Sequence, residues 1–161
     1  MVAIVDTGAD LSHPDLSAKF VSQGRDFISG HANAQDDQGH GTHVSGIVSA
    51  MTNNGTGVAG VGYNARLLPV KVLNSNGSGD YGSIVQGITW AADQGVKVLN
   101  MSLGGAGGTQ ALQDAVDYAW NKGVVVVCAA GNDGNASPNY PAAYANCLSV
   151  VATDQNDQKA S

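Results

Sequence analysis

The sequence has little charge, few aromatic side chains, few cysteines and no long apolar run. Only 12% of its 161 residues are charged and 22 are glycine, whereas typical soluble domains carry about 25% charged residues. This composition argues against a disordered chain and against a coiled coil, because both are rich in charged residues. Thirteen acidic and seven basic residues give a formal charge of −6, which repels phosphate backbones and anionic lipid. We therefore expect neither a nucleic-acid partner nor a membrane partner.

Cysteine usage and apolar run length exclude two further classes of protein. Two cysteines, Cys128 and Cys147, are too few for a disulfide-stapled mini-protein, and they form no Cys-x-x-Cys pair of the zinc or redox kind. The longest apolar run, residues 123–130, is far shorter than the ~20 residues that cross a bilayer. No signal peptide is visible at the N-terminus, where the sequence leads directly into an apolar β-branched segment.

Apolar segments of two kinds alternate along the chain. Short β-branched runs predict strands, and apolar residues three or four apart predict helices. The predicted strands are residues 2–5, 66–73, 97–101, 124–130 and 148–152, with candidate short strands at 20–21 and 27–28. The predicted helices are residues 42–51, 84–92 and 111–120. We therefore expect one α/β domain, residues 1–161, in which a mostly parallel sheet lies between two layers of helices.

Ligands of such folds bind outside the carboxyl ends of the strands, so the residues that follow strands are the candidate site residues. Asp6 ends the first predicted strand and begins the run Asp-Thr-Gly-Ala-Asp. Taken alone, an aspartate before Thr-Gly is most often a turn residue. The run also matches a half-site of a retroviral-type aspartic protease, which requires an all-β chain and two such aspartates sharing a proton. The three predicted helices argue against that alternative.

Two histidines, His40 and His43, lie three residues apart in the run Gly-His-Gly-Thr-His. Zinc ligation with Asp36 or Asp37 is one interpretation, but a structural zinc needs four well-placed donors and the usual helical histidine pair is four apart. A lone buried histidine bonded to backbone is the simpler interpretation of His43. The glycines beside His40 let other groups approach it closely, which suits a reactive histidine.

Two glycine-rich turns complete the candidates. Residues 77–82 match Gly-x-Gly-x-x-Gly, but the next predicted strand runs into Gly104 and Gly105 without the acidic residue of a dinucleotide site. An edge that pairs with another extended backbone fits the same residues equally well. Asn132 lies in Gly-Asn-Asp-Gly, which by itself predicts a turn. Because Asn132 follows a strand on the same sheet edge as Asp6, its amide is also a candidate donor to a developing negative charge.

In chain order, four motifs resemble the subtilisin-like serine proteases, and most closely the thermitase branch. They are Val-Asp-Thr-Gly around Asp6, Gly-His-Gly-Thr-His-Val around His40, Ser-Leu-Gly-Gly from Ser102 and Ala-Gly-Asn up to Asn132. The resemblance covers essentially the whole chain and implies a serine endopeptidase. In this family the aspartate orients the histidine, the histidine is the general base for a serine nucleophile, and the asparagine amide donates to the oxyanion. A non-catalytic, peptide-binding relic of the same fold is the alternative.

The resemblance also implies a substrate groove and a structural calcium site. An extended peptide would lie between two segments, with a specificity pocket beside them; the residues are Gly77, Ser78, Gly79, Tyr81, Ser102, Leu103, Gly104, Ala129, Ala130 and Gly131. The calcium ligands would be the carboxylate of Asp15, the side chain of Asn54 and the backbone oxygens of Met51, Thr56 and Val58, all of them the oxygen donors that calcium prefers. The resemblance carries over only in part to a second calcium site of the thermitase branch, which would retain Asp26 but have Ser29 and His31 in place of acids.

One part of the family pattern is missing. The family's nucleophile lies in a Gly-Thr-Ser-Met-Ala motif, and no such motif occurs among these residues. We therefore expect a partial catalytic domain, truncated at both ends, that carries the aspartate and histidine but is inactive alone and has an incomplete calcium site. The family further implies polypeptide substrates, a pro-segment that acts as chaperone and inhibitor, a monomer, and secretion. A disulfide between Cys128 and Cys147 is a hypothesis, because the two would lie on neighbouring strands.

Overall fold

A parallel sheet of six strands forms the centre of residues 1–159, the part of the chain that the computed structural model describes. The strand order is β2-β3-β1-β4-β5-β6, so the first strand lies in the middle of the sheet. The strands are β1 (Val2–Asp6), β2 (Arg25–Asp26), β3 (Leu67–Lys71), β4 (Val98–Met101), β5 (Val125–Ala129) and β6 (Leu148–Val150). The helices are α1 (His40–Ser49), α2 (Tyr81–Asp93) and α3 (Gln110–Asn121), with a short 3-10 turn, η1 (Ser17–Lys19).

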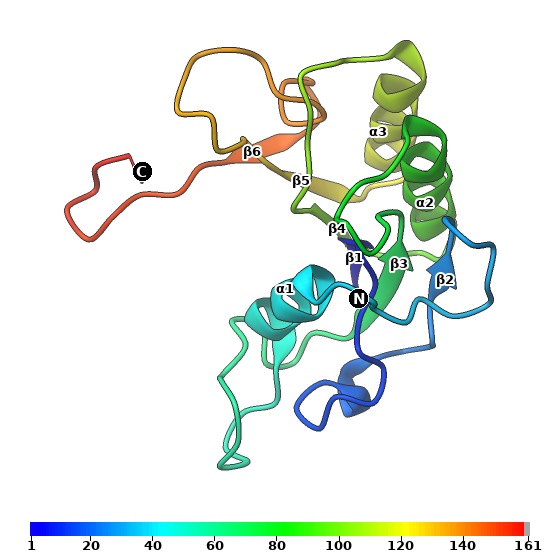
Figure 1. Cartoon of the computed structure of the whole chain (residues 1–161), viewed down its shortest axis with the longest axis vertical. Coiled ribbons are helices and arrows are strands. Elements are labelled where there is room, and N and C mark those ends of the chain that lie inside the picture. The colour runs from blue at the N-terminus through cyan, green and yellow to red at the C-terminus, as the bar shows by residue number, and fades with distance from the viewer. Residues whose placement is uncertain (160–161) are drawn as a thin grey trace.

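Helices lie on both faces of the sheet, as the alternation of segments predicts. Figure 1 shows α2 and α3 side by side against one face and α1 against the other, where it contacts β1. The main core fills the space between the sheet and the α2–α3 layer, and its centre includes Val70, Ile88 and Leu99. The predicted three-layer α/β architecture is therefore confirmed. A parallel sheet with helices is incompatible with the all-β fold that the aspartic-protease alternative requires.

The α1 face of the sheet is covered unevenly among the described residues. In β5, Val126 and Cys128 are buried against the α2–α3 layer, whereas Val125 is exposed and Val127 is only partly buried. Alternating burial of this kind means that one face of the strand is packed and the other is open. The expected cover on both faces therefore holds near β1 and not at the outer strands.

The helix starts follow local capping chemistry. The Asp80 side chain accepts a hydrogen bond from Ser83 N at the start of α2, and the Thr109 side chain accepts one from Leu112 N at the start of α3. Helix α1 begins at His40, two residues before the predicted start, because apolar spacing does not register the glycine-flanked first turn. This places His40 within the helix, where its backbone geometry is fixed.

The predicted short strands are wrong in position. The strand in that region is β2, residues 25–26, which pairs with the end of β3. Phe20 forms only an isolated bridge with Leu67, and Phe27 N donates to Lys71 O just beyond the paired residues. Phe20 and Phe27 pack against the core, and the regular strand ladder is confined to residues 25–26, which lie between the two predicted strands.

A disulfide joins Cys128 in β5 to Cys147, which directly precedes β6. Their Cα atoms are 6.1 Å apart, and 19 positions separate them in the sequence. The bond closes the long connection between the two neighbouring strands. It therefore fixes both ends of the segment that contains Asn132.

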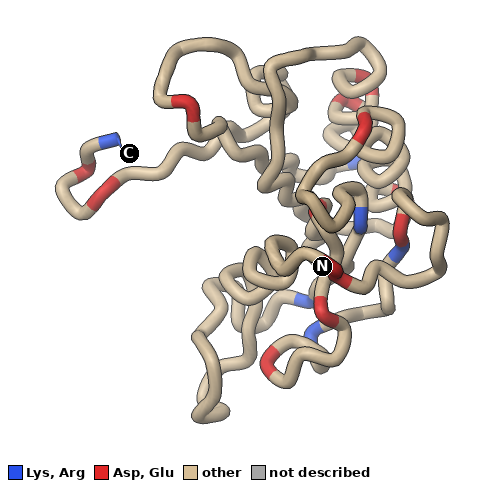
Figure 2. Tube along the Cα trace, in the orientation of Figure 1, with Lys and Arg blue, Asp and Glu red and all other residues tan. Residues whose placement is uncertain are grey.

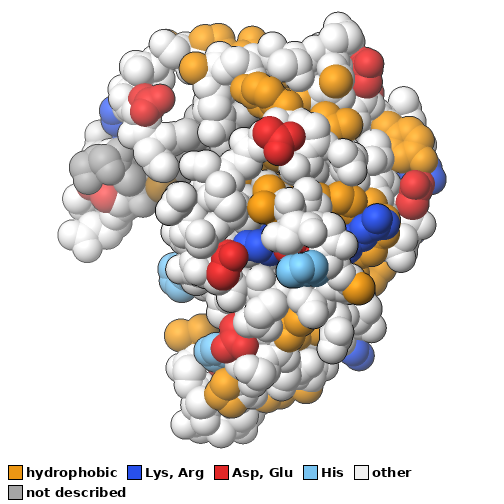
Figure 3. All heavy atoms as spheres, turned by 45° about the vertical axis from the view of Figure 1, so that its right-hand side comes forward, with side chains coloured by type: hydrophobic (Ala, Val, Ile, Leu, Met, Phe, Trp, Pro, Cys, Tyr) orange, Lys and Arg blue, Asp and Glu red, His pale blue; other side chains and the backbone are white. Residues whose placement is uncertain are grey.

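The surface carries mixed charge. Figure 2 shows acidic and basic residues scattered over the whole trace. Figure 3 shows apolar side chains gathered mainly on the upper part of one face, with histidine and charged side chains across its middle. Among the residues that the structure describes, no helix has both the length and the apolar character to span a bilayer.

Candidate active site

A histidine and an aspartate form a direct hydrogen bond at the carboxyl edge of the sheet. Asp6 ends β1, and its side chain is completely buried. His40 opens α1, and 46% of its side chain is exposed. His40 Nδ1 lies 2.7 Å from Asp6 Oδ1, which also accepts the backbone N–H of Thr7 at 2.7 Å. Because Nδ1 is engaged by the carboxylate, Nε2 is the ring nitrogen left to exchange a proton with another group.

The electrostatics of Asp6 reflect its burial. Burial raises the pKa of Asp6 above its usual value, and hydrogen bonds from His40 and Thr7 act in the opposite direction. The second carboxylate oxygen, Oδ2, is buried and has no hydrogen-bond partner among residues 1–159. The hydrogen bonds from His40 and Thr7 therefore offset part of the cost of burying this carboxylate.

Close backbone approach allows this geometry. Helix α1 packs its first turn onto the turn after β1, and a Cβ on Gly41 would overlap the Gly8 carbonyl and lie 3.1 Å from Asp6 Cβ. Gly8 itself has a φ of 105°, in the left-handed region that favours glycine. The glycines around His40 therefore bring the helix and the strand end together as well as leaving the histidine accessible.

Asp36 organises the approach to the helix, a role that the sequence did not predict. Its Oδ1 accepts the Thr7 hydroxyl at 2.9 Å, and its Oδ2 accepts the Thr42 N–H at 3.0 Å. Further bonds come from the backbone N–H groups of Gln38 and Gly39. Burial acts to raise the pKa of Asp36, but these hydrogen bonds outweigh it and the pKa is lowered. The side chain is thus held as a carboxylate that caps the start of α1.

The alternative of a zinc site finds no donor cluster. Within the described part of the chain, no group of three or more His, Cys, Asp or Glu side chains is arranged to hold a metal ion. Asp36 is saturated by hydrogen bonds, and Asp37 pairs with Lys71 at 2.6 Å. His43 is exposed in α1, so the interpretation of a buried histidine is wrong. Asp36 and Asp37 stabilise the turn before α1.

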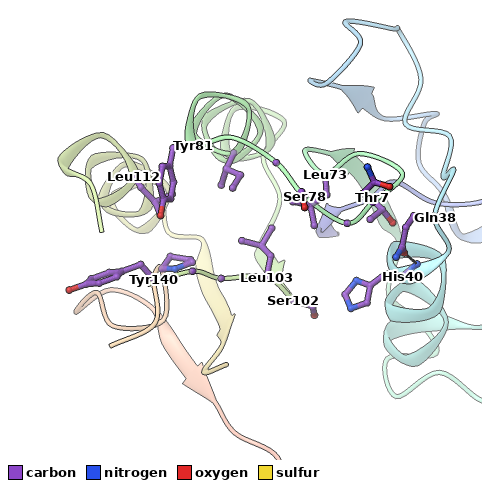
Figure 4. A pocket seen from close by; sticks show the side chains of 17 residues that line it. Thr7, Gln38, His40, Leu73, Ser78, Tyr81, Ser102, Leu103, Leu112 and Tyr140 are labelled. Atoms are coloured by element: carbon purple, nitrogen blue, oxygen red, sulfur yellow. Dashed lines mark hydrogen bonds between the residues drawn. The ribbon is translucent and has the colours of Figure 1, made fainter. Parts of the chain in front are cut away.

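A groove of about 600 Å³ opens beside His40. It contains seven of the predicted substrate-binding residues, namely Gly77, Ser78, Gly79, Tyr81, Ser102, Leu103 and Gly104. Figure 4 shows Gln38 and His40 at one end, Leu112 and Tyr140 at the other, and Leu103 between them. The two glycine-rich segments therefore lie along a common cleft that ends at the histidine.

The other three predicted substrate-binding residues and Asn132 line a second pocket of about 470 Å³. It contains Ala129, which ends β5, and Ala130, Gly131 and Asn132, which follow it, together with residues of β6 and its continuation. Ser102 lines both pockets, so the two are neighbours along the carboxyl edge. His40 and Asn132 thus lie in adjoining cavities of the described chain.

Several groove residues were not predicted from the sequence. Tyr140 and Pro141 come from a distant loop, joined by a cis peptide bond, and line the end opposite His40. Leu112 reaches the same end from the first turn of α3. Tyr-Pro is a turn signal, but nothing in it shows which cleft the turn borders. A backbone bridge between Tyr140 and Gly105 brings the turn to the groove, and the position of α3 brings Leu112 there.

The predicted calcium ligands gather in one loop cluster. Asp15 is buried, and its carboxylate accepts the side-chain N–H of Asn54 at 2.6 Å and the Val58 N–H at 3.4 Å. Met51 N donates to the backbone oxygen of Asp15, and Thr56 N donates to Asn54 Oδ1. Asp15 forms no salt bridge with any residue of the described chain. A buried carboxylate without a counter-ion is one feature that suits a calcium ion, but the contacts of this carboxylate in the structure are the N–H groups of Asn54 and Val58 and not oxygens.

Asp26, the residue that the second calcium site of the thermitase branch would retain, is used differently. It is buried, and its Oδ1 accepts the N–H groups of Ile28 at 2.7 Å and Ser29 at 3.0 Å. Its own N–H donates to His31 O. The side chain therefore stabilises a turn after β2.

Comparisons with a family model, with known sequences and with solved structures all match this chain to proteases. The model of the subtilase family of peptidases matches residues 1–161. Thermitase from Thermoactinomyces vulgaris is 55% identical over 99% of this chain and 57% of that protein. The thermophilic serine proteinase of Bacillus sp. strain AK1 is 49% identical over 99% of this chain and 40% of that protein. A solved psychrophilic protease, S41, superposes with a TM-score of 0.87 at 41% identity, covering 98% of this chain and 55% of its own.

The chain thus spans about half the length of the relatives that it matches. The match is continuous and includes the strand end of Asp6, the helix start of His40 and the segment of Asn132. On the strength of the family match over its whole length and of the fold, the chain belongs to the subtilase family of serine proteases.

Proposed function

We propose that this chain is the Asp and His part of a serine endopeptidase, with Asp6 and His40 as two members of a triad. The observation that carries the proposal is the 2.7 Å bond between His40 Nδ1 and Asp6 Oδ1 at the end of a groove of about 600 Å³. The Asp6 carboxylate holds the imidazole in the tautomer that leaves Nε2 free to accept a proton. The buried negative charge also stabilises the imidazolium that forms when a serine hydroxyl is deprotonated.

The catalytic sequence uses His40 twice. Nε2 takes the proton from the serine hydroxyl as that oxygen attacks the peptide carbonyl, and it then gives the proton to the leaving amine. Asn132 is proposed to donate its side-chain N–H to the carbonyl oxygen as negative charge develops there. Hydrolysis of the acyl-enzyme repeats the same proton transfers with water as the nucleophile.

The proposed substrate is a polypeptide bound as an added strand. Ser78 and its flanking glycines would pair with one edge of the peptide, and residues 102–104 with the other. Glycines suit this role because the substrate backbone must approach closely. The pocket that contains Ala129, Ala130 and Gly131 would hold the side chain beside the cleaved bond, and Tyr81 would border a second apolar pocket.

The nucleophile is proposed to lie outside residues 1–161, since the sequence contains no Gly-Thr-Ser-Met-Ala motif. Ser45 is buried within α1 and Ser102 lies between the two pockets, without a hydrogen bond to His40. We propose that the 161-residue chain is inactive until it is joined to the part of the domain that carries the serine. For the full protein we propose secretion, a monomeric state and a pro-segment that assists folding and inhibits the enzyme, as the family resemblance implies.

A chimera tests the catalytic proposal. Residues 1–161 are joined to the remaining part of thermitase, and hydrolysis of a chromogenic peptide and labelling by a fluorophosphonate are measured. We expect hydrolysis by the chimera and neither labelling nor hydrolysis by the isolated chain. His40→Ala in the chimera should lower kcat by roughly 10⁶-fold. Asn132→Ala should lower kcat by about 10²–10³-fold, whereas Asn121→Ala, at the exposed end of α3, should change nothing.

Three outcomes would count against the proposal. Robust hydrolysis by the isolated chain would refute an external nucleophile. A folded chimera that binds a peptide inhibitor without hydrolysing peptides would favour the non-catalytic relic. Equal activity of the His40→Ala variant and the parent chimera would remove His40 from the mechanism.

We also propose that calcium stabilises the chain at Asp15. The buried Asp15 carboxylate and the oxygens of Met51, Asn54, Thr56 and Val58 would hold the ion, with the Asn54 amide turned so that its oxygen replaces the N–H group. Added calcium should raise the unfolding temperature of the wild-type chain. Asp15→Ala should abolish that rise, and Asp26→Asn, a change at another buried aspartate, should preserve it. An equal calcium response in the wild type and in Asp15→Ala would refute the site.

A further inference from the structure

A buried lysine lies beside Asp6, on the neighbouring strand of the sheet. Lys71 ends β3, and only 3% of its side chain is exposed. Its ammonium donates to three acceptors: Thr7 O at 2.8 Å, Leu73 O at 2.9 Å and Asp37 Oδ1 at 2.6 Å. All three N–H groups of the ammonium are therefore matched, which is the condition under which a buried charge is tolerated.

The three acceptors belong to three different parts of the site. Thr7 directly follows Asp6 in the turn after β1. Leu73 lies in the segment that leads from β3 to the glycines lining the groove. Asp37 lies in the segment that enters α1 at His40. A single ammonium thus bonds to the turn after Asp6, to the segment before His40, and to the segment that leads to the groove glycines.

Backbone bonds connect the lysine to Asp6 as well. Lys71 and Asp6 are register partners in the parallel ladder, and Asp6 O accepts the N–H groups of Val72 and Leu73. Thr7 in turn is bonded both to Asp6 and to the first turn of α1. Its N–H donates to Asp6 Oδ1, and its hydroxyl accepts the N–H of Gly41 at 2.9 Å.

These bonds make the His40–Asp6 distance depend on the ammonium of Lys71. If the ammonium is removed, the Thr7 and Leu73 carbonyls lose a buried donor and the Asp37 carboxylate loses its counter-ion. Buried carbonyls without donors are costly, so the turn after β1 will move to find other partners. Because Asp6 Oδ1 and the first turn of α1 are both bonded to Thr7, that movement changes the geometry of the catalytic pair.

We propose that Lys71 is a positioning residue of the active site, which fixes the His40–Asp6 hydrogen bond by holding Thr7, Leu73 and Asp37 together. The proposal rests on the catalytic function proposed above for its kinetic consequence, but its structural consequence is independent of activity. A side chain that contributed only to general stability would leave the ring of His40 and the turnover of folded molecules unchanged. This difference makes the two roles separable.

The test compares Lys71→Met with a surface control. Lys71→Met keeps the apolar stem and removes all three donors, while Lys122→Met removes a lysine paired with Asp93 on the surface. The Nδ1 proton and the titration of the His40 ring are followed by NMR in the 161-residue chain and in the thermitase chimera, and kcat and KM are measured in the chimera. For Lys71→Met we expect a displaced or lost Nδ1 proton signal and a kcat about 10–100-fold lower, with KM changing much less. For Lys122→Met we expect wild-type values.

A milder variant keeps the proposal testable if Lys71→Met fails to fold. Asp37→Ala removes one acceptor whose side chain is 53% exposed, so the fold should persist. We expect the same shift of the His40 signal in the same direction, but smaller. A wild-type His40 signal and kcat in folded Lys71→Met, or in Asp37→Ala where Lys71→Met does not fold, would overturn the proposal. An inactive parent chimera whose His40 signal still responds to Lys71→Met would refute the catalytic function and leave the positioning role standing.

Discussion

Replacing Gly41 with alanine distinguishes the effect of helix propensity from the effect of tertiary contacts at the site. Gly41 is the second residue of α1, and alanine is the better helix former by about 1 kcal/mol. On helix propensity alone, Gly41→Ala should stabilise the protein. The tertiary contacts predict the opposite, because the added Cβ would overlap the Gly8 carbonyl and lie 3.1 Å from Asp6 Cβ.

The size of the effect follows from those contacts. Ordinary carbon–carbon contacts are about 3.5–4.0 Å, so the helix start must retreat from Asp6 by roughly 0.5–1 Å, and further if the Gly8 oxygen stays in place. A retreat of about 1 Å would lengthen the 2.7 Å His40–Asp6 bond beyond hydrogen-bond range. It would also stretch the 2.9 Å bond from Gly41 N to the Thr7 hydroxyl. We expect a net loss of about 1–2 kcal/mol of unfolding free energy, since overpacking typically costs about 1–3 kcal/mol.

Urea unfolding of the chain and NMR detection of the His40 Nδ1 proton measure these two effects. In the thermitase chimera, displacement of this size should lower kcat by about 100-fold. Gly46→Ala is the matched control, because it lies in the same helix and nothing is within 4 Å of the Cβ it would carry. That control should gain about 1 kcal/mol of stability and leave the His40 signal unchanged. The reasoning is refuted if Gly41→Ala is as stable as Gly46→Ala and keeps the wild-type His40 signal.

Three further predictions concern ionisation and the disulfide. Because burial raises the pKa of Asp6, its contribution to stability is present below about pH 4 and is lost as the pH rises through the raised pKa. Asp6→Asn should therefore unfold at a higher temperature than the wild type at neutral pH, with a difference that disappears in acid; lower stability at neutral pH would contradict this. The lowered pKa of Asp36 has the opposite sign, so Asp36→Asn should lose unfolding free energy at neutral pH and approach the wild type below about pH 4, and a pH-independent difference would count against it. Reduction of the bond between Cys128 and Cys147 should lower the unfolding free energy by about 3 kcal/mol, and thiol titration of the denatured, unreduced chain that finds two free thiols would show that the bond is absent.

Much of the fold follows from patterns within short segments. Apolar periodicity predicted α2 and α3, and β-branched runs predicted five of the six strands of the described sheet. The two-residue strand β2 was misplaced, because its pairing depends on contact with the end of β3 and leaves no periodic pattern of its own. The start of α1 was also misplaced, since two glycines and a histidine carry no apolar signal.

The candidate site shows the same division. Asp6 and His40 were predicted as site residues because each stands in a specific motif at the end or start of an element. Asp36 and Lys71 were not assigned their roles, since a single aspartate or lysine in a sequence gives no information about which carbonyls and amides surround it. Tyr140 and Pro141 were not predicted as groove residues, because the turn signal of Tyr-Pro does not show which cleft the turn borders.

From the sequence by itself came the family, the layered α/β architecture, the prediction of Asp6 and His40 as site residues, and the two glycine-rich segments that line the groove. Those features depend on residue type and on spacing within one segment, which the sequence states directly. Only the tertiary structure decided that His40 Nδ1 bonds Asp6, that Asp36 caps α1, and that Lys71 joins three separate segments. The reason is that hydrogen-bond partners of buried polar groups are chosen by which chain segments packing brings within about 3 Å, and these segments lie up to 64 positions apart.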